Sequence, residues 1–572
     1  MRFPIFSRPD GGNGAVRRRI RGAVAIAAVL AVSTGLAACA KSQRGSESTS
    51  NSGGTFVFAA SSDPVMLDPA HASDGETFRP AEQIFEGLVS LKPGTTEVQP
   101  LLATDWTAGK DGKTFDFTLR KGVKFTDGTD FNAAAVCYNF DRWYNWTGLN
   151  QNENISAYYN DIFHGFKTGP LAKDAIYKSC TANGDDKVTI KLQHPFAAFI
   201  QAMTLPSFSM QSPTAMKKYN ADDIAGTEND PRFSEYATAH PTGTGPFKFS
   251  SWDRGQSVTL VRNDNYWGQK AHLAKIILRT ISDPKARTQE LESGGVQGYD
   301  LVGPADIKPL KDKGYQVLTR PAFNILYMGM NQYNKDLQNI KVRQAISYAI
   351  DKQAVVKQSL PEGSVPAKEF MPPTVAGYTD DVNTYDYDPA KAKQLLKEAG
   401  FSADKPLTLK FAYPTGVSRP YMPSPEDTYL SIKSQLESVG IKIVPVSAKW
   451  SPDYLDMTAS EDGKSKHDLH LLGWTGDYND PDNFVGVFFA QYSPEWGFKN
   501  PKLFADLTKA RGLPTREQQV PAYEAINKEI SEFIPGVPIA HPAPSLALAP
   551  EVKGYIPGPS KDAVWNVVSI KK

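Results

Sequence analysis

A helix that ends in a glycine and is followed at once by a strand occurs twice in the second half of this sequence. The first helix begins at Asp388-Pro389 and ends at Gly400, and the second begins at Ser424-Pro425 and ends at Gly440. A capping residue followed by proline is typical of a helix start, and glycine is typical of a helix end. The strand-like segments LTLKFAY and IKIVPV come next. This alternation predicts an α/β fold with an at least partly parallel sheet.

Other segments support the same fold class. Residues 341–356 carry apolar side chains at helical spacing and predict a single helix. Five segments show the two-residue alternation or the β-branched content of strands, and they begin at Thr55, Thr114, Lys187, Ser257 and Leu407.

Composition sets the class of protein. A chain of 572 residues predicts two to four domains, and 40% hydrophobic residues are ordinary for a globular protein. Lys plus Arg number 63 and Asp plus Glu 62, so the formal charge is +1. This balance argues against a nucleic-acid partner. Only one stretch is apolar enough to approach a membrane, which excludes a protein with several transmembrane spans.

That apolar stretch, residues 22–38, follows an arginine-rich start and precedes Cys39. It is short and rich in small residues, so residues 1–38 predict a signal peptide rather than a spanning helix. The residues Leu36-Ala37-Ala38-Cys39 resemble a bacterial lipobox, which implies cleavage before Cys39 and acylation of its thiol. The alternative is an ordinary secretory signal. Residues 39–54 are rich in Ser and Gly and predict a tether that holds the protein on the outer face of the cell membrane.

Two further cysteines remain in the exported chain, Cys137 and Cys180. An exported protein meets an oxidising environment, so we expect these two residues to form a disulfide. The alternative is a pair of buried free thiols.

Several long blocks then identify a family resemblance. The block TGTGPFKFSSWDRGQSVTLVRNDNYWG, residues 242–268, resembles one found in bacterial extracellular solute-binding proteins of family 5, the peptide- and nickel-binding subunits of ABC importers. Residues 102–136, 340–356 and 385–401 resemble further blocks of this family, in the family order. The resemblance extends over about residues 55–572.

The resemblance implies a type II periplasmic-binding-protein-like fold of the large peptide-binding class, with two α/β lobes that close on a ligand. The first lobe is then expected at 55–322, with an extra subdomain at about 98–235. The second lobe is expected at 323–540, and residues 541–572 return to the first lobe. A permease and an ATPase are the implied partners, and a monomer is expected.

Two segments, SRPYMP and GWTGDYNDPDNF, resemble the dipeptide-binding branch of the family. In that branch the corresponding arginine binds the peptide carboxylate and the aspartate binds the α-ammonium, which assigns these roles to Arg419 and Asp477. Arginine suits a carboxylate because its guanidinium donates two parallel hydrogen bonds. The further ligand-binding residues implied by the same mapping are Pro420, Tyr421, Trp474, Thr475, Gly476 and Ser73.

Two other functional classes stay open at this point. The same scaffold could bind haem, a nickel chelate, an oligosaccharide or an amino-acid derivative, or the chain could be an extracytoplasmic hydrolase or scaffold lipoprotein. We find no catalytic set in the sequence and expect a binding protein without cofactor. His467 and His470 read as the start of a strand, where residues three apart face opposite sides, so we expect no metal site there.

Overall fold

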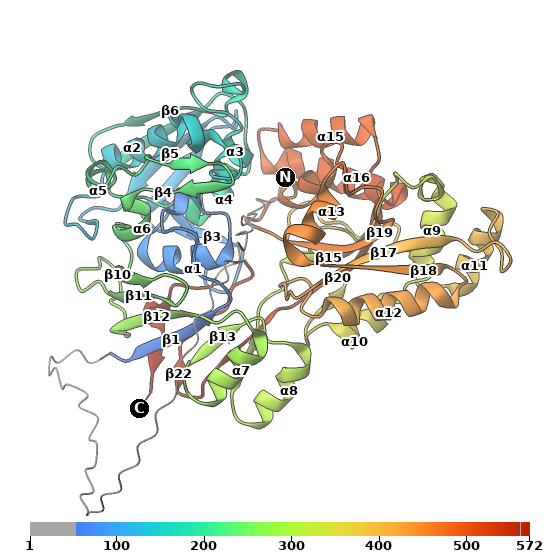
Figure 1. The fold of residues 1–572 in the computed structure, drawn as a ribbon. Helices are drawn as coiled ribbons and strands as arrows, with labels where there is room; N and C mark the ends of the chain where they lie inside the picture. Colours follow the sequence, from blue (N-terminus) through green and yellow to red (C-terminus); the bar gives the residue numbers. More distant parts are fainter. Residues whose placement is uncertain (1–52, 561, 572) are drawn as a thin grey trace, which may run out of the picture.

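The computed structural model describes residues 53–560 and 562–571. Two large β-sheets lie side by side in it, and a smaller sheet lies beyond the first of them (Figure 1). The predicted signal peptide and Cys39 lie outside the described residues.

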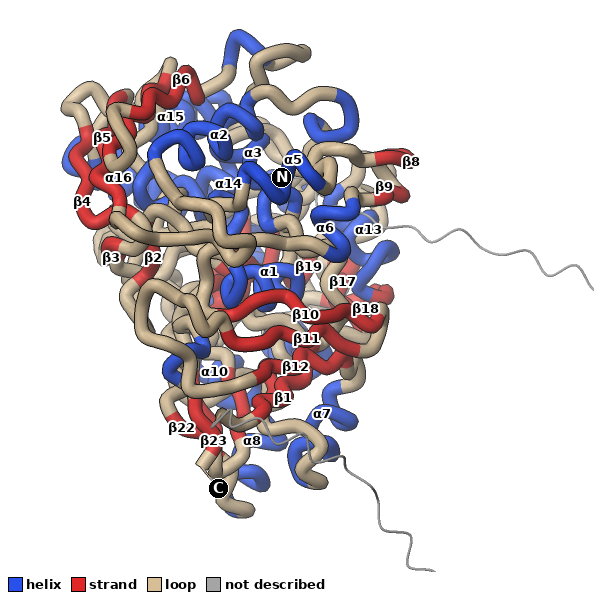
Figure 2. Tube along the Cα trace, turned by 90° about the vertical axis from the view of Figure 1, so that its left-hand side faces the viewer, coloured by secondary structure: helices blue, strands red, loops and turns tan. Residues whose placement is uncertain are grey.

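The first sheet has seven strands in the order β10-β11-β12-β1-β13-β21-β14. Strand β1 lies between two parallel neighbours, β12 and β13, and the other pairs are antiparallel. Figure 2 shows β10, β11, β12 and β1 running next to one another. The strands span β10 Phe247–Asp253, β11 Ser257–Arg262, β12 Lys275–Thr280, β1 Thr55–Ala60, β13 Gly298–Asp300, β21 Ser545–Leu548 and β14 Gln316–Thr319, and the accompanying helices are α1 Gly75–Ile84, α7 Pro284–Glu292 and α8 Pro304–Asp312.

The second sheet has six strands in the order β16-β20-β15-β19-β17-β18, and β17 is parallel to both of its neighbours. The central strand β15 is buried along its whole length, because helices cover both faces of the sheet. The strands span β16 Val365–Pro366, β20 Gly536–His541, β15 Asn324–Met330, β19 Leu469–Thr475, β17 Thr408–Thr415 and β18 Lys442–Lys449.

Alternate residues of β15 belong to two different cores. Leu326, Met328 and Met330 pack with one group of helices, whereas Ile325 and Tyr327 pack with another. The first group is α9 Ile340–Tyr348, α10 Lys352–Ser359, α11 Pro389–Glu398 and α12 Pro425–Ser438, and the second is α13 Leu455–Ala459, α14 Val487–Phe489, α15 Pro501–Arg511 and α16 Arg516–Phe533.

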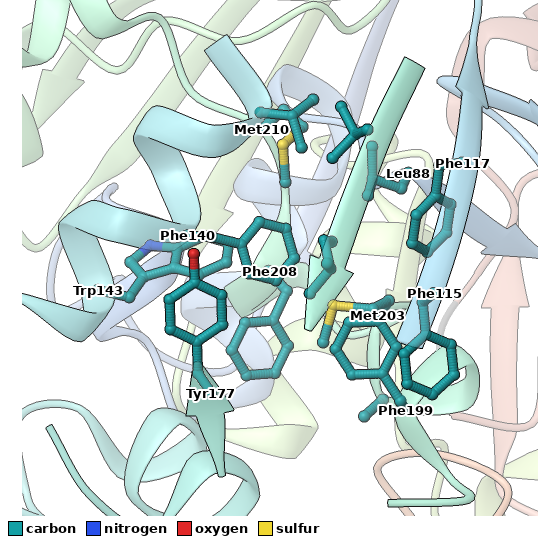
Figure 3. Packing of buried hydrophobic residues seen from close by; sticks show 14 of the residues in the cluster. Leu88, Phe115, Phe117, Phe140, Trp143, Tyr177, Phe199, Met203, Phe208 and Met210 are labelled. Carbon is teal, nitrogen blue, oxygen red and sulfur yellow. The ribbon is translucent and has the colours of Figure 1, made fainter. Parts of the chain in front are cut away.

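The smaller sheet, in the order β4-β5-β7-β6, forms a subdomain with its own aromatic core (Figure 3). Phe115 of β5 and Phe140 of α2 both pack around Phe199, and a disulfide joins Cys137 to Cys180, the pair expected from the sequence. The elements span β4 Ala103–Ala108, β5 Thr114–Leu119, β7 Lys187–Leu192, β6 Tyr177–Ala182, α2 Ala133–Tyr144, α3 Ala157–Phe163, α4 Phe199–Ala202, α5 Pro213–Lys218 and α6 Glu235–Ala239.

Three two-stranded ribbons complete the described strands. They are β2 Val89–Leu91 with β3 Val98–Pro100, β8 Ala225–Thr227 with β9 Asp230–Arg232, and β22 Val552–Lys553 with β23 Ser569–Ile570.

The five predicted strands are confirmed as β1, β5, β7, β11 and β17, and the two glycine-terminated helices as α11 and α12. Gly400 and Gly440 adopt φ angles of 92° and 95°, which explains the glycine at each end. The single helix predicted over 341–356 is wrong. The helix is interrupted between α9 and α10, because the Asp351 side chain accepts a hydrogen bond from the Ala354 amide and caps a new helix.

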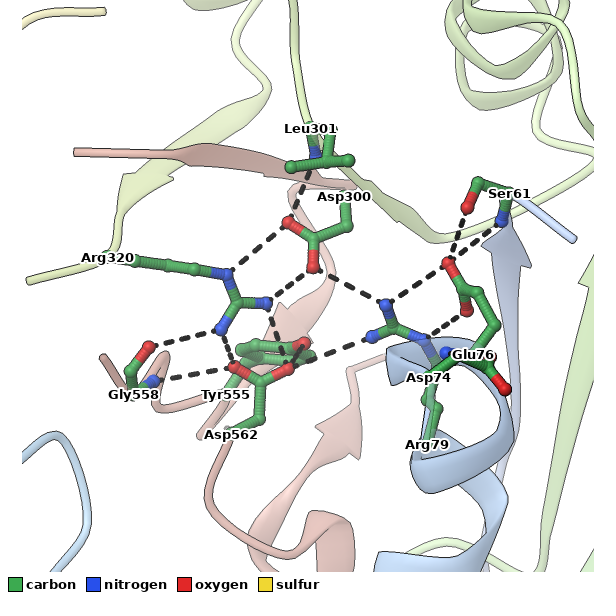
Figure 4. Close-up of polar contacts among 10 residues, drawn as sticks. All are labelled: Ser61, Asp74, Glu76, Arg79, Asp300, Leu301, Arg320, Tyr555, Gly558 and Asp562. Atoms are coloured by element: carbon green, nitrogen blue, oxygen red, sulfur yellow. Dashed lines mark hydrogen bonds and ion pairs between the residues drawn. The ribbon is translucent and has the colours of Figure 1, made fainter. Parts of the chain in front are cut away.

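The chain crosses between the two large sheets at 320–323 and again at 542–544, and the crossings touch: the Arg320 amide donates to the Pro544 carbonyl at 2.8 Å. The Arg320 guanidinium is buried in an ion network of the first sheet (Figure 4). It pairs with Asp300 at 2.7 Å and with Asp562, and Asp300 also lies 3.5 Å from Arg79 of α1. Burial alone would raise the pKa of Asp300, but the two guanidinium groups outweigh it and lower that pKa.

Candidate functional site

Arg419 and Asp477 follow neighbouring parallel strands. Arg419 lies four residues after the end of β17, and Asp477 lies two residues after the end of β19. Parallel strands end at the same edge of a sheet, and in open α/β sheets ligands bind at that edge. The topology therefore brings the two predicted charged residues to one edge of the second sheet.

Packing also holds the loop that carries Arg419 against the strand that leads to Asp477. A Cβ atom on Gly473 of β19 would lie 2.3 Å from Cδ2 of Tyr421 and 2.3 Å from the Ile325 carbonyl. Only glycine fits there, and the buried Tyr421 ring lies directly against it. Gly476 is similarly enclosed, since its Cβ would lie 2.5 Å from Phe323 and 2.6 Å from Phe484. The glycines of the GWTGD segment thus serve close packing.

The Asp477 carboxylate accepts hydrogen bonds from neutral donors. The Tyr158 hydroxyl of α3 donates to Oδ1 at 2.6 Å, and the Asn483 amide donates to Oδ2 at 3.1 Å. Burial raises the pKa of Asp477 to about 6, an effect that these two hydrogen bonds partly oppose. Among the described residues no cation forms an ion pair with this carboxylate.

Arg419 is also a charge without an ion-pair partner within the described part of the chain. Its guanidinium lies over the Trp450 ring at 4.4 Å, and its Nε is buried without a hydrogen-bond partner. Burial lowers the pKa of Arg419, whereas the nearby Tyr421 and Asp74 act in the opposite direction. Asp74 is the amino-terminal cap of α1, so a carboxylate beside the first sheet acts electrostatically on Arg419.

The remaining predicted ligand-binding residues lie near Arg419 or Asp477 in the sequence or come from the segment before α1. Thr475 Oγ1 and Trp474 Nε1 are buried without hydrogen-bond partners, and the Trp474 ring packs against the core under α13 to α16. Pro420 lies between Arg419 and Tyr421 and is half-buried. Ser73 lies just before α1, and its role stays a prediction.

The expectation that His467 and His470 face opposite sides is wrong. Their rings lie 5.1 Å apart, because β19 begins only at Leu469 and His467 precedes the extended segment. The His470 Nε2 atom lies 3.0 Å from Glu495, and burial lowers the pKa of His467 to about 3. Across residues 53–560 and 562–571, no three His, Cys, Asp or Glu side chains are arranged to hold a metal ion.

Comparison with known proteins identifies the family. Residues 97–495 match the model of bacterial extracellular solute-binding proteins, family 5 Middle. The chain belongs to this family. It is 32% identical over 532 residues to the dipeptide-binding protein of Escherichia coli (strain K12), which covers 90% of this chain and 95% of that protein.

A second relative and a solved structure show that the similarity covers nearly the whole length of each protein. Heme-binding protein A of Haemophilus influenzae is 30% identical over 560 residues, covering 93% of this chain and 96% of the relative. The crystal structure of a dipeptide-binding protein from Pseudoalteromonas sp. SM9913, in complex with Met-Leu, superposes with a TM-score of 0.73. It is 27% identical and covers 90% of this chain and all of its own.

Membership confirms the predicted α/β periplasmic-binding-protein fold and gives the general function. The protein is a solute-binding protein of an ABC transporter, acts outside the cytoplasm and is not an enzyme. None of its helices in the described ranges is both long and apolar enough to cross a membrane.

Sequence reasoning missed three neighbours of the charged pair. Asn483 lies within the GWTGDYNDPDNF segment, so its proximity to Asp477 could have been expected from the sequence. Tyr158 and Trp450 come from distant segments, and no local pattern marks them. Only the fold brings them to Asp477 and Arg419.

Proposed function

We propose that this protein captures dipeptides outside the membrane and delivers them to the permease of an ABC importer. One observation carries the proposal: the half-buried side chains of Arg419, whose Nε atom is fully buried, and of Asp477 lie at the same sheet edge, and neither has an ion-pair partner among the described residues. A buried charge without a partner is costly. A ligand that brings a carboxylate to Arg419 and an ammonium to Asp477 would remove both costs.

The dimensions of the site support a short ligand. The loops that carry Arg419 and Asp477 leave neighbouring strands, which lie about 5 Å apart in a sheet. An extended dipeptide spans about 7 Å between its ends. Charge-assisted hydrogen bonds at each end contribute about 1.5–3 kcal/mol, so recognition can depend on the two termini and tolerate varied side chains.

Calorimetry on protein refolded to remove bound solute tests this proposal. We expect a mixed dipeptide pool to bind, and both the N-acetylated and the C-amidated pools to bind at least about tenfold more weakly. Asp477→Asn and Arg419→Ala should each weaken binding by a similar factor without lowering the melting temperature. Equal binding of free and blocked peptides would refute the two-ended site.

Haem is the second candidate ligand, because one relative covering 93% of this chain is a heme-binding protein. Haem is therefore titrated in parallel with the peptides. Haem binding that Asp477→Asn leaves unchanged, together with no binding of dipeptides, would replace the dipeptide proposal.

We also propose that acylation of Cys39 anchors the protein to the membrane, and that residues 40–54 act as its tether. The support is the lipobox-like sequence before Cys39. The wild-type protein should remain with membranes after export, and Cys39→Ser should release it into the soluble fraction. Equal membrane retention of both proteins would contradict the anchor.

A further inference from the structure

Tyr478, the residue next to Asp477, belongs to the second lobe in sequence but to the subdomain in packing. Its side chain is 5% exposed and lies in the aromatic core of the subdomain, where all the other buried members come from residues 70–210. A large apolar side chain of one lobe is thus inserted into the other. Withdrawing it would expose apolar surface on both sides.

The residues on either side of Tyr478 also bridge the two lobes. Asp477 accepts the hydrogen bond from Tyr158 of α3, and Asn479 donates one to Oγ1 of Thr96 at 2.8 Å. Three consecutive residues therefore reach across to the first lobe. Asp477 and Tyr478 contact its subdomain, and Asn479 contacts the connection between β2 and β3.

Arg511, at the end of α15, adds a fourth contact. Its guanidinium donates to the Asp161 carbonyl of α3 at 2.7 Å and lies 3.4 Å from Asp482 of its own lobe. Nearby, a Cβ on Gly112 of the β4–β5 turn would lie 2.5 Å from the Pro514 carbonyl, so the lobes also meet closely there.

The segment that carries Tyr478 is fixed within the second lobe. Arg516 pairs with Asp480 at 2.7 Å, and the Tyr523 hydroxyl donates to Asp482 at 3.1 Å. Both partners come from α16. Because these contacts hold residues 480–482 against α16, Tyr478 must move with the second lobe when the lobes separate.

We propose that Asp477, Tyr478, Asn479 and Arg511 form an interlobe latch, in which Tyr478 is a positioning residue that holds the lobes closed around the ligand. The latch deepens the proposed function, on which it rests for the identity of the ligand. Asp477 would bind the ligand while its neighbour Tyr478 enters the subdomain core. Ligand binding and lobe closure would then depend on the same short segment.

Tyr478→Ala tests the latch, with Tyr387→Ala as the matched control on an exposed tyrosine of the second lobe. Fluorescent labels on cysteines placed at the exposed residues Leu171 and Leu430 report the distance between subdomain and second lobe. We expect Tyr478→Ala to lower the closed fraction and to raise the rate of dipeptide dissociation about tenfold, while the association rate changes by less than about threefold. Tyr387→Ala should behave like wild type.

An unchanged closed fraction and dissociation rate in Tyr478→Ala would overturn the latch. If that variant does not fold, Asn479→Ala, which removes the bond to Thr96, is measured in its place, with a smaller rise in dissociation expected. The closed fraction is also measured without ligand. If dipeptides do not bind wild type, yet Tyr478→Ala still lowers the ligand-free closed fraction, the dipeptide proposal fails and the latch stands.

Discussion

Asp477 is held by two neutral donors, Tyr158 and Asn483, and by no cation within the described part of the chain. Neutral donors orient a carboxylate without cancelling its charge, so the charge stays available for an incoming ammonium group. Because no cation among the described residues opposes it, burial is the dominant influence on the carboxyl group. Burial raises the pKa of Asp477 to about 6.

This shift predicts a pH dependence of ligand affinity. An ammonium group binds the ionised carboxylate, so binding must compete with protonation below the pKa of about 6. The association constant for a dipeptide should therefore fall as pH is lowered from 7 to 5, approaching tenfold per pH unit at the acid end. The ends of the peptide itself titrate outside this range. Calorimetry at several pH values measures the slope.

Asp477→Asn is the control for that measurement. Its weaker binding should be nearly independent of pH between 5 and 7. A slope equal to that of wild type would assign the titration to another group, and Asp161, which interacts electrostatically with Asp477, is the first candidate. Burial and the Asp477 charge raise the pKa of Asp161 to about 7.

At the scale of elements, β19 and the loop after β17 depend on the contact between Gly473 and Tyr421. Gly473→Ala places a methyl group 2.3 Å from both the tyrosine ring and the Ile325 carbonyl. Overpacking of this kind costs about 1–3 kcal/mol. We expect a lower melting temperature and weaker dipeptide binding, because Tyr421 and its neighbour Arg419 must shift together.

Gly303→Ala is the matched control, since the nearest atom to its added Cβ is an Asp306 side-chain oxygen at 3.4 Å. Calorimetric unfolding and dipeptide titration are compared for the two variants. A Gly473→Ala protein with the stability and affinity of wild type would show that the Tyr421 ring moves freely and does not position Arg419.

The elements themselves were largely predictable, because their signals are local. Alternating residues in β5 and β7, and the proline and glycine at the ends of α11, report structure within a few positions. The prediction over 341–356 was wrong because the apolar spacing of α9 continues into α10, while the break depends on one capping carboxylate, Asp351. The meeting of Arg419 with Trp450, or of Asp477 with Tyr158, depends on tertiary packing that leaves no local trace.

At the scale of the whole molecule, buried acids set how stability changes with pH. Glu369 is 3% exposed, and burial, with a smaller effect of Asp380 and Glu524, raises its pKa from 4.5 to about 9. The folded protein therefore keeps a proton here that the unfolded chain releases above pH 4.5. The contribution of Glu369 to stability is fully present below that pH and is lost as pH rises toward 9.

Glu369→Gln should remove this loss. The variant should melt at a higher temperature than wild type at pH 9, by about 1 °C for each kcal/mol gained in a chain of this length, and at nearly the same temperature at pH 5. Glu362→Gln, at a glutamate whose side chain is 81% exposed, should match wild type at both pH values. Equal melting temperatures of wild type and Glu369→Gln at pH 9 would contradict this assignment.

The two crossings between the large sheets also determine the order in which the two sheets can be completed during synthesis. Strand β21, residues 545–548, lies between β13 and β14 and is the strand to which β14 is paired, although both neighbours precede it by more than 220 residues. The first sheet is therefore incomplete until residues 545–548 have been synthesised. A chain that stops short of Ser545 leaves both neighbours with open edges. Of the two large sheets, the one that begins first, with β1, is therefore completed after the other, whose last strand, β20, ends at His541.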